Sequence, residues 1–488
     1  MAKAITLFVI SLLVAPGLGL FASLFGMHKI ATSNSLGSIA EVTAVCASAL
    51  PGESPGCSTF GTLHLLMQLA GVALVGTLAL PLVYLFAAIA LARSRNLLAR
   101  YFPWLVRIVL GVLPLLLALH GLLIWFGAWE MFEMGLLPAD YRIAILFGGL
   151  GLVLVVTAIS IVADMRRMLE LDPLHVTGVM LERRELPELF ERVSRLARKL
   201  GSREPERIIL GIEPTAYVAN VPVKLRGVGD LPTAETLYLS TVALRVLDDA
   251  ELDALIGHEL GHFRGADVEF STRFAPAFRS LAVASQSVSS QQDDEDSMSI
   301  ALIPAIGLLA FMNYTLSRIV SRIQREREFA ADQASLEVST AQASTSLLIK
   351  FSMLTICWHG FHIGVSRLLH RGVSRKNLSR DYLLFTRQFL AATQREDLKR
   401  WLVEAHTPHP LDTHPPVVQR AAAFGLDPGR VMDVSLSALN VDRPVSELLD
   451  VLEERISQID ADYYRHPAQR VEVSSELDLP LELTFTKR

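Results

Sequence analysis

The sequence predicts a membrane protein in which an N-terminal bundle of four transmembrane helices precedes a mainly helical α+β domain with a small antiparallel sheet. The composition is 51% apolar and only 19% charged, and the mean hydropathy of +0.38 is high for a soluble protein. The excess of apolar residues lies in the first third of the chain, and the composition after residue 164 is that of a soluble domain.

Four long apolar stretches account for the excess. Each meets or exceeds the ~20 residues with which a helix crosses a bilayer. A cleavable signal peptide is the alternative for the first stretch, but its apolar run exceeds the usual ~7 to 15 residues and three further spans follow. The stretches cover residues 4–25, 62–92, 104–129 and 143–163, within a transmembrane unit of residues 1–164.

The basic residues predict the orientation, because Lys and Arg in short loops stay in the cytoplasm. Arginines follow the second and the fourth span, whereas the loop 26–61 holds a single lysine and the loop between the third and fourth spans is acidic. We therefore expect a multi-pass protein of a bacterial inner membrane. Its loop 26–61 lies outside the cytoplasm, and its domain 165–425 faces the cytoplasm.

The cysteines and the net charge narrow the possible partners. Cys46 and Cys57 share the loop predicted to be outside, where an oxidising compartment permits a disulfide, so a disulfide and two free thiols both remain open. Cys357 is interpreted as a small buried hydrophobic residue. The net charge of −5, without a basic cluster beyond the membrane-flanking arginines, argues against nucleic acid as a partner.

Local patterns predict the elements of residues 165–425. Residues 187–201 have apolar positions at helical spacing between a proline and a glycine. The runs "RIILGI", "AYVANVPV" and "TLYLST" predict the strands of the antiparallel sheet. Asp248, with Glu251 three residues later, forms a capping-box pattern that begins a helix running to Gly265.

The segments beyond this helix differ in polarity. The acidic run 289–297 is predicted to be a mobile loop that acts as a lid. The apolar segment 300–316 is short for a span and either dips into the bilayer or packs in a core. A further helix is expected over 317–335, and residues 426–488 form a polar tail.

The predicted helix contains "HELGH", in which two histidines lie four residues apart. Residues i and i+4 share one face of a helix, so His258 and His262 can direct two imidazoles at one metal ion. Glu259 lies beside that face, where it can act on a metal-bound water. A solvated face fits poorly, because the helix is apolar and unpartnered polar groups are costly to bury. The pattern predicts one catalytic zinc ion in a zincin-type metallopeptidase domain.

A catalytic zinc ion usually has three protein ligands, so a third is required. The metzincin spacing would place it at position 268, but Val268 cannot bind a metal. The segment "REREFAAD" offers Glu328, with Asp332 one turn later, and Glu326 is a rival ligand. A run of Arg and Glu is otherwise usually an ion-paired, solvated face.

Three motifs in order resemble the HtpX-like and CAAX prenyl protease family of membrane zinc metallopeptidases: "LSTVALRVLDDAELDALIGHELGHFRGAD", "SRIQREREFAAD" and "DTHPPVVQR". The resemblance implies that His258, His262 and Glu328 bind zinc and that Glu259 is the general base. It also implies that the Asp332 carboxylate orients a ligating histidine.

The same resemblance implies further roles. His414 and Arg420 would stabilise the oxyanion and the wall of the active site. Members of the family commonly bind the substrate backbone along an Asn-Ala-Phe-like edge strand, and the corresponding residues Thr215, Ala216 and Tyr217 depart from that pattern. Strand-type binding remains expected, because backbone groups do most of that work. His406 and His409 lie outside the matched motif and are interpreted as surface histidines.

We therefore predict a membrane-anchored zinc endopeptidase that cleaves membrane or membrane-proximal proteins in the cytoplasm, in protein quality control. Its expected partners are the lipid bilayer and protein or peptide substrates, and no oligomeric state follows from the sequence. A CAAX-type processing protease for prenylated proteins is one alternative, although no second large membrane bundle follows the motifs. A non-catalytic zinc scaffold is another, although structural zinc sites usually have four ligands and no cysteine lies near the motifs.

Overall fold

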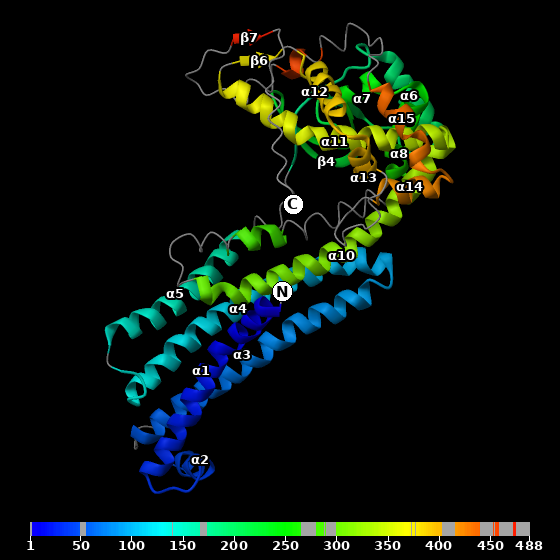
Figure 1. Cartoon of the computed structure of the whole chain (residues 1–488). Helices are drawn as coiled ribbons and strands as arrows, with labels where there is room; N and C mark the ends of the chain where they lie inside the picture. The colour runs from blue at the N-terminus through cyan, green and yellow to red at the C-terminus, as the bar shows by residue number, and fades with distance from the viewer. Residues whose placement is uncertain are drawn as a thin grey trace. The chain divides into compact units, whose positions relative to one another are not determined.

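The chain divides into two compact units, which are drawn in Figure 1. Unit 1 comprises Met1–Leu171 and Arg273–Ile319, and unit 2 comprises Asp172–Thr272 and Val320–Arg488. The computed structural model describes residues 2–48, 55–138, 140–165, 173–264, 280–286, 288, 299–371, 373–375, 377–402, 415–439, 452, 454–457 and 472–474.

Unit 1 is built from long apolar helices. The contacts run from α1 to α3 and α4, from α3 to α4, and from α4 to α5. Ala22, Ala70 and Ala73 are fully buried between the helices, where small side chains let the backbones approach. The helices are α1 (Ala2–Ser33), α2 (Ile39–Ser48), α3 (Pro55–Leu91), α4 (Arg95–Glu133) and α5 (Tyr141–Asp164).

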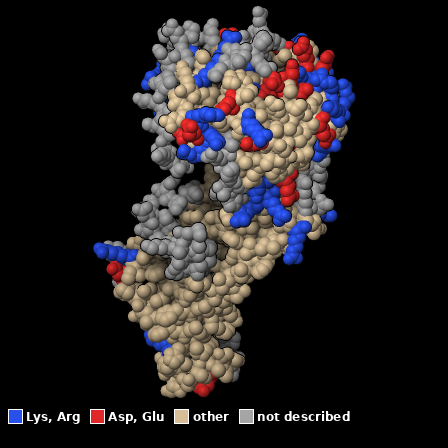
Figure 2. All heavy atoms as spheres, turned by 45° about the vertical axis from the view of Figure 1, so that its right-hand side comes forward, with Lys and Arg blue, Asp and Glu red and all other residues tan. Residues whose placement is uncertain are grey.

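The outer surface of unit 1 is apolar. Val75, Phe86 and Leu115 are 66%, 67% and 69% exposed, and the face drawn in Figure 2 has few charged side chains along the length of this unit. Such a surface requires an apolar surrounding. Four stretches of unit 1 are long and apolar enough to cross a membrane, namely Leu13–Ser33, Gly56–Leu91, Arg100–Glu133 and Arg142–Asp164.

Two features depart from a plain bundle of four helices. The predicted loop 26–61 contains α2, and a disulfide between Cys46 and Cys57 joins α2 to the start of α3. Helix α10 (Ser299–Val338) also contributes its first part to unit 1, where the Tyr84 hydroxyl donates to the backbone oxygen of Met312 at 3.1 Å. The segment 300–316 therefore packs with the apolar helices of unit 1.

Helix α10 is one unbroken helix, although the sequence was interpreted as two segments, 300–316 and 317–335. No proline interrupts it after residue 304, and no glycine after residue 307. The change from apolar to charged side chains is therefore a change of surroundings within one helix, because its first part belongs to unit 1 and its second part to unit 2.

The sheet of unit 2 is mixed, so the prediction of an antiparallel sheet is wrong. Its five strands are ordered β1-β4-β5-β3-β2. β5 lies between β4 and β3. It pairs antiparallel with β4 and parallel with β3. The three predicted strands exist as β3, β4 and β5, whereas the short β1 and β2 were missed. The strands are β1 (Leu174–Val176), β2 (Val179–Met180), β3 (Arg207–Gly211), β4 (Tyr217–Leu225) and β5 (Gly229–Ser240).

The remaining elements of unit 2 are mainly helices. The predicted helix over 187–201 is confirmed as α6, and α15 lies inside the predicted polar tail and packs against α11. The helices are α6 (Pro187–Leu200), α7 (Thr241–Val246), α8 (Asp249–Phe263), α11 (Ala341–His370), α12 (Leu378–Ala392), α13 (Arg395–Leu402), α14 (Val417–Ala423) and α15 (Pro428–Ala438), and the strands β6 (Val373–Arg375) and β7 (Glu472–Ser474) form a parallel pair.

Helix α11 passes through the core of unit 2. The stretch Ala341–Leu369 is also long and apolar enough to cross a membrane. It nevertheless contacts α8, α12, α14 and α15, and Ile349 and Leu354 are fully buried against the rest of the unit. These contacts place one face of α11 in the core of unit 2, and 44% of its apolar window is buried.

A buried ion pair holds α11 to the start of α8. Asp248 and Glu251 form the predicted capping box, which is thereby confirmed. The Lys350 ammonium lies 2.6 Å from the Glu251 carboxylate and also donates to the backbone oxygen of Val246 at 3.0 Å. Lys350 and Glu251 are only 1% and 3% exposed, so each charge depends on the other.

Replacing Lys350 alone should destabilise the protein strongly. Lys350→Met leaves the Glu251 carboxylate buried without its counter-charge, which costs about 3 to 5 kcal/mol. The midpoint of unfolding of the detergent-solubilised protein, followed by tryptophan fluorescence, measures the loss. Lys350→Met with Glu251→Gln should recover part of it, and Lys199→Met on the exposed side of α6 is the control. Equal midpoints for Lys350→Met and Lys199→Met would contradict this account.

Candidate metal centre

Helix α8 carries the two histidines and the glutamate of the "HELGH" motif. The capping box fixes its first turn, and both its apolar and its polar side chains are buried along most of its length. His258 and Glu259 are 9% and 6% exposed. Polar groups are therefore concentrated in an interior position, where they need partners.

Two glycines let α10 approach the histidine face of α8 closely. A Cβ atom on Gly261 would lie 2.9 Å from the Cα atom of Ala331, and one on Gly257 would lie 2.4 Å from a methyl group of Val338. Both distances are too short for real contacts, so only glycine fits at these positions. The spacing of four residues puts both glycines on one face of α8, and α10 packs along that face.

The close approach brings a carboxylate of α10 to the two histidines. Glu328 Oε2 lies 3.5 Å from His258 Nε2, and Glu328 Oε1 lies 3.6 Å from His262 Nε2. One donor atom from each of the three side chains lies within 4.8 Å of the others. Two imidazoles and a carboxylate are a donor set that suits zinc, so this cluster can hold a metal ion.

The structure separates Glu328 from its rival in the same motif. Glu328 is 4% exposed and faces the histidines. The Glu326 side chain is 61% exposed and pairs with Arg322 at 3.4 Å, one turn back on the same helix. Glu326 therefore lies on the solvated, ion-paired face of α10, and Glu328 lies on the buried face.

Asp332 connects His258 to the third motif. Its carboxylate lies 3.1 Å from His258 Nδ1 and accepts hydrogen bonds of 2.8 and 2.5 Å from the Arg420 guanidinium of α14. Arg420 Nη2 also lies 3.4 Å from His258 Nδ1. Since the ionised Asp332 carboxylate can only accept, we assign a proton to Nδ1 that is donated to Asp332. This bond orients the ring and directs Nε2 toward Glu328.

The same contacts set the proton affinity of the site. Burial alone would lower the pKa of His258, but the hydrogen bonds with Asp332 and Glu328 outweigh it and raise this pKa to about 9. Burial alone would raise the pKa of Asp332, but the hydrogen bonds from Arg420 and His258 hold it below the usual value. Without a bound metal, His258 is therefore protonated and Asp332 is ionised at neutral pH.

The remaining predicted site residues fall into two groups. Tyr217 begins β4, and Thr215 and Ala216 directly precede it. His414, like His406 and His409, lies outside the described residues, as do Gly265, Val268 and the predicted lid 289–297. The glycine pair of α8 was missed, although its spacing of four residues is visible in the sequence.

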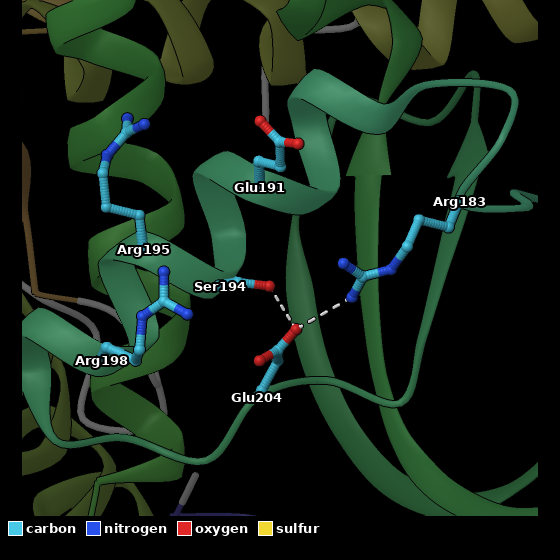
Figure 3. A pocket seen from close by; sticks show the side chains of 6 residues that line it. All are labelled: Arg183, Glu191, Ser194, Arg195, Arg198 and Glu204. Atoms are coloured by element: carbon cyan, nitrogen blue, oxygen red, sulfur yellow. Dashed lines mark hydrogen bonds and ion pairs between the residues drawn. The ribbon is translucent and has the colours of Figure 1, made fainter.

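Figure 3 shows a pocket of unit 2 that does not involve the histidine cluster. It has a volume of about 410 Å³ and is lined by residues of α6 and its flanking loops. Glu204 accepts a hydrogen bond from Ser194 and pairs with Arg183. The lining is Arg183, Glu191, Ser194, Arg195, Arg198 and Glu204.

Comparison with known proteins identifies the domain that carries the cluster. The profile of peptidase family M48 matches residues 185–425, which include α8, α14 and the metal-site half of α10. Residues 185–425 belong to peptidase family M48. The resemblance stated from the three motifs is therefore confirmed, and no solved structure matches the chain.

The relatives of this M48 domain include proteins named protease HtpX homolog. The one from Methanopyrus kandleri is 31% identical over 163 residues, which cover 32% of this chain and 47% of the relative. Those from Methanocaldococcus jannaschii and Gemmatimonas aurantiaca are each 25% identical, over 236 and 245 residues, and these matches cover 47% and 49% of this chain and 74% and 75% of the relatives. The chain thus spans about half the length of the first relative.

Glu328 and Glu326 provide a matched test of the donor set. Glu328→Gln should abolish stable zinc binding, because one of three ligands is lost. Glu326→Gln removes the same charge two residues away and should leave zinc binding unchanged. The zinc content of each purified variant, measured by mass spectrometry after dialysis against a weak chelator, decides between the two glutamates. Retention of zinc by Glu328→Gln would exclude Glu328 as a ligand.

The raised pKa of His258 predicts that zinc binding releases a proton. A metal binds the neutral imidazole, and without metal His258 keeps its proton up to about pH 9. Zinc affinity should therefore rise about ten-fold per pH unit between about pH 7 and pH 9 and then level off. Calorimetry in buffers of different ionisation enthalpy counts the released protons. Asp332→Asn should shift this dependence to lower pH, and a pH-independent affinity would refute the assignment.

Proposed function

We propose that the chain is a membrane-anchored, zinc-dependent endopeptidase that hydrolyses peptide bonds of membrane or membrane-proximal proteins. The observation that carries the proposal is the cluster of His258, His262 and Glu328 beside the buried Glu259. The donor set fits a catalytic zinc ion, because three protein ligands leave a fourth position for water or substrate. One ion per chain is proposed.

The chemistry is divided between the metal and the surrounding side chains. Bound zinc would supply a Lewis acid that acidifies a water molecule and polarises the scissile carbonyl. Glu259 takes the proton of the attacking water and later delivers it to the leaving amine. Arg420 and Asp332 hold His258 in place. His414 is proposed to donate to the oxyanion, as in the resemblance.

The substrate backbone is proposed to bind along β4. Among the described residues, β1 pairs only with Val223–Leu225 of β4, whereas β5 covers the other edge of β4 from Tyr217 onward. The edge of β4 near Tyr217 is therefore open for another extended chain, which would add as a further strand. Because α8 contacts β4, a peptide bound there passes near the metal ligands.

Unit 1 supports the proposed orientation. The disulfide between Cys46 and Cys57 fits an oxidising compartment outside the cytoplasm, which supports the charge-based orientation. We propose a bacterial inner membrane, cleavage on its cytoplasmic side, and a role in protein quality control. A CAAX-type processing protease for prenylated proteins is the alternative enzyme. A non-catalytic, zinc-binding membrane scaffold is the alternative in which the protein is not an enzyme.

Glu259→Gln separates catalysis from metal binding. Glu259 is not a proposed ligand, so the variant should keep its zinc while its cleavage of a membrane protein substrate in proteoliposomes falls by about 10² to 10⁴. Release of peptide fragments measures the rate, and Glu326→Gln is the control for the loss of a carboxylate. Cleavage at the wild-type rate would refute the mechanism. A comparison of the membrane proteins that accumulate in cells with Glu259→Gln and in cells with wild type distinguishes general membrane substrates from prenylated proteins.

A further inference from the structure

One end of unit 1 carries three pairs of an arginine with an exposed aromatic ring. The guanidinium carbon atoms of Arg100, Arg107 and Arg318 lie 5.5, 5.3 and 5.8 Å from the ring centres of Tyr101, Trp104 and Tyr314. These rings are 45%, 60% and 48% exposed. We call these six residues the arginine–aromatic belt. Rings of this kind sit at the headgroup level of a bilayer, and arginines bury their stems while keeping the charge in water.

The pairs belong to one level of unit 1, although they come from two helices distant in sequence. Tyr84 of α3 contacts Phe102 of α4 at 6.0 Å and Phe311 of α10 at 6.2 Å. Figure 1 shows α10 running toward the end of unit 1 at which α3 turns into α4. Arg318, six residues after Met312, therefore lies at that end together with Arg100.

The opposite end of α4 gives the depth of this belt. Trp125 and Trp129 are 57% and 60% exposed. Trp125 follows Trp104 by twenty-one residues, which is about 32 Å of helix. The hydrocarbon core of a bilayer is about 30 Å thick. With the two tryptophan levels at the two interfaces, the arginine–aromatic belt lies among the lipid headgroups.

The two stretches of chain that carry the belt hold basic residues and no acidic ones. Residues 55–129 and 299–325 contain no Asp or Glu, whereas the last turn of α4 contains Glu130 and Glu133. Arg318 donates to the hydroxyl of Tyr314 at 3.0 Å, so its guanidinium is held beside the ring and keeps further donors for an anion. Arginine matches a phosphate group with two parallel hydrogen bonds.

From this arrangement we infer that the arginine–aromatic belt binds the headgroup phosphate of anionic phospholipids, with Arg100 and Arg318 as the contacting cations. The ring beside each arginine places the guanidinium at phosphate depth, and the absence of acidic side chains from these stretches leaves the positive charge for the lipid. The same site anchors α10, the helix that carries Glu328 ten residues further on. Lipid binding is measured without cleavage, so the inference can fail or hold independently of the proposed function.

The test measures phospholipid bound to the full-length protein. Wild-type protein in phosphatidylcholine nanodiscs is titrated with phosphatidylglycerol, and the bound lipids are counted by native mass spectrometry. We expect a preference for phosphatidylglycerol that falls about five-fold for each of Arg100→Gln and Arg318→Gln and about twenty-five-fold for both, since each basic residue contributes about 1 kcal/mol at an anionic surface.

The matched control is the double variant Arg195→Gln with Arg198→Gln, which removes two exposed arginines from α6. It should keep the wild-type preference. The inference is overturned if this control loses the preference to the same extent, or if Arg100→Gln with Arg318→Gln retains it. Should that variant fail to fold, wild type alone decides. Its preference for phosphatidylglycerol should fall as the salt concentration is raised, and a wild type without preference refutes the site.

Discussion

The contact on which the candidate metal centre depends is the close approach of α8 and α10. Glycine is required at 257 and 261 because the backbone and side chains of α10 occupy the space of a side chain there. This approach brings Glu328 to within 3.6 Å of both histidines. A helix separation larger by the size of a methyl group would leave the carboxylate out of reach of a shared ion, since ligand distances vary little.

Helix α10 belongs to both units: its first part lies among apolar helices and its second part carries the site carboxylates. Its first part accepts a hydrogen bond from Tyr84 among the apolar helices of unit 1, and its second part carries Glu328 and Asp332 into the core of unit 2. The N-terminal turn of α8 is held separately, by the capping box and the buried pair of Glu251 with Lys350. Each of the two site helices thus has an anchor outside the site itself.

Short-range patterns explain what the sequence could predict. The apolar stretches of unit 1, the capping box at Asp248 and the pairing of His258 with His262 depend on residues within one helix, and the structure has all three. The mixed sheet was missed because parallel pairing of β5 with β3 is a long-range contact. The local pattern left Glu328 and Glu326 open, because a run of alternating Arg and Glu does not reveal which side of α10 faces α8; only the family resemblance implied Glu328.

The charged groups of the site are buried beside one another, and each is stabilised by a neighbour of opposite charge. The carboxylates of Glu328 and Asp332 are buried on one face of α10. Arg420 reaches both, at 3.6 and 2.5 Å, and so does His258, at 3.5 and 3.1 Å. Burial of the imidazole would lower the pKa of His258, but the hydrogen bonds with these two carboxylates raise it to about 9. A divalent cation fits this site better than a proton, because it can bind the Glu328 carboxylate and one nitrogen of each imidazole at once. The raised pKa is thus a property of a site whose donors are arranged around positive charge.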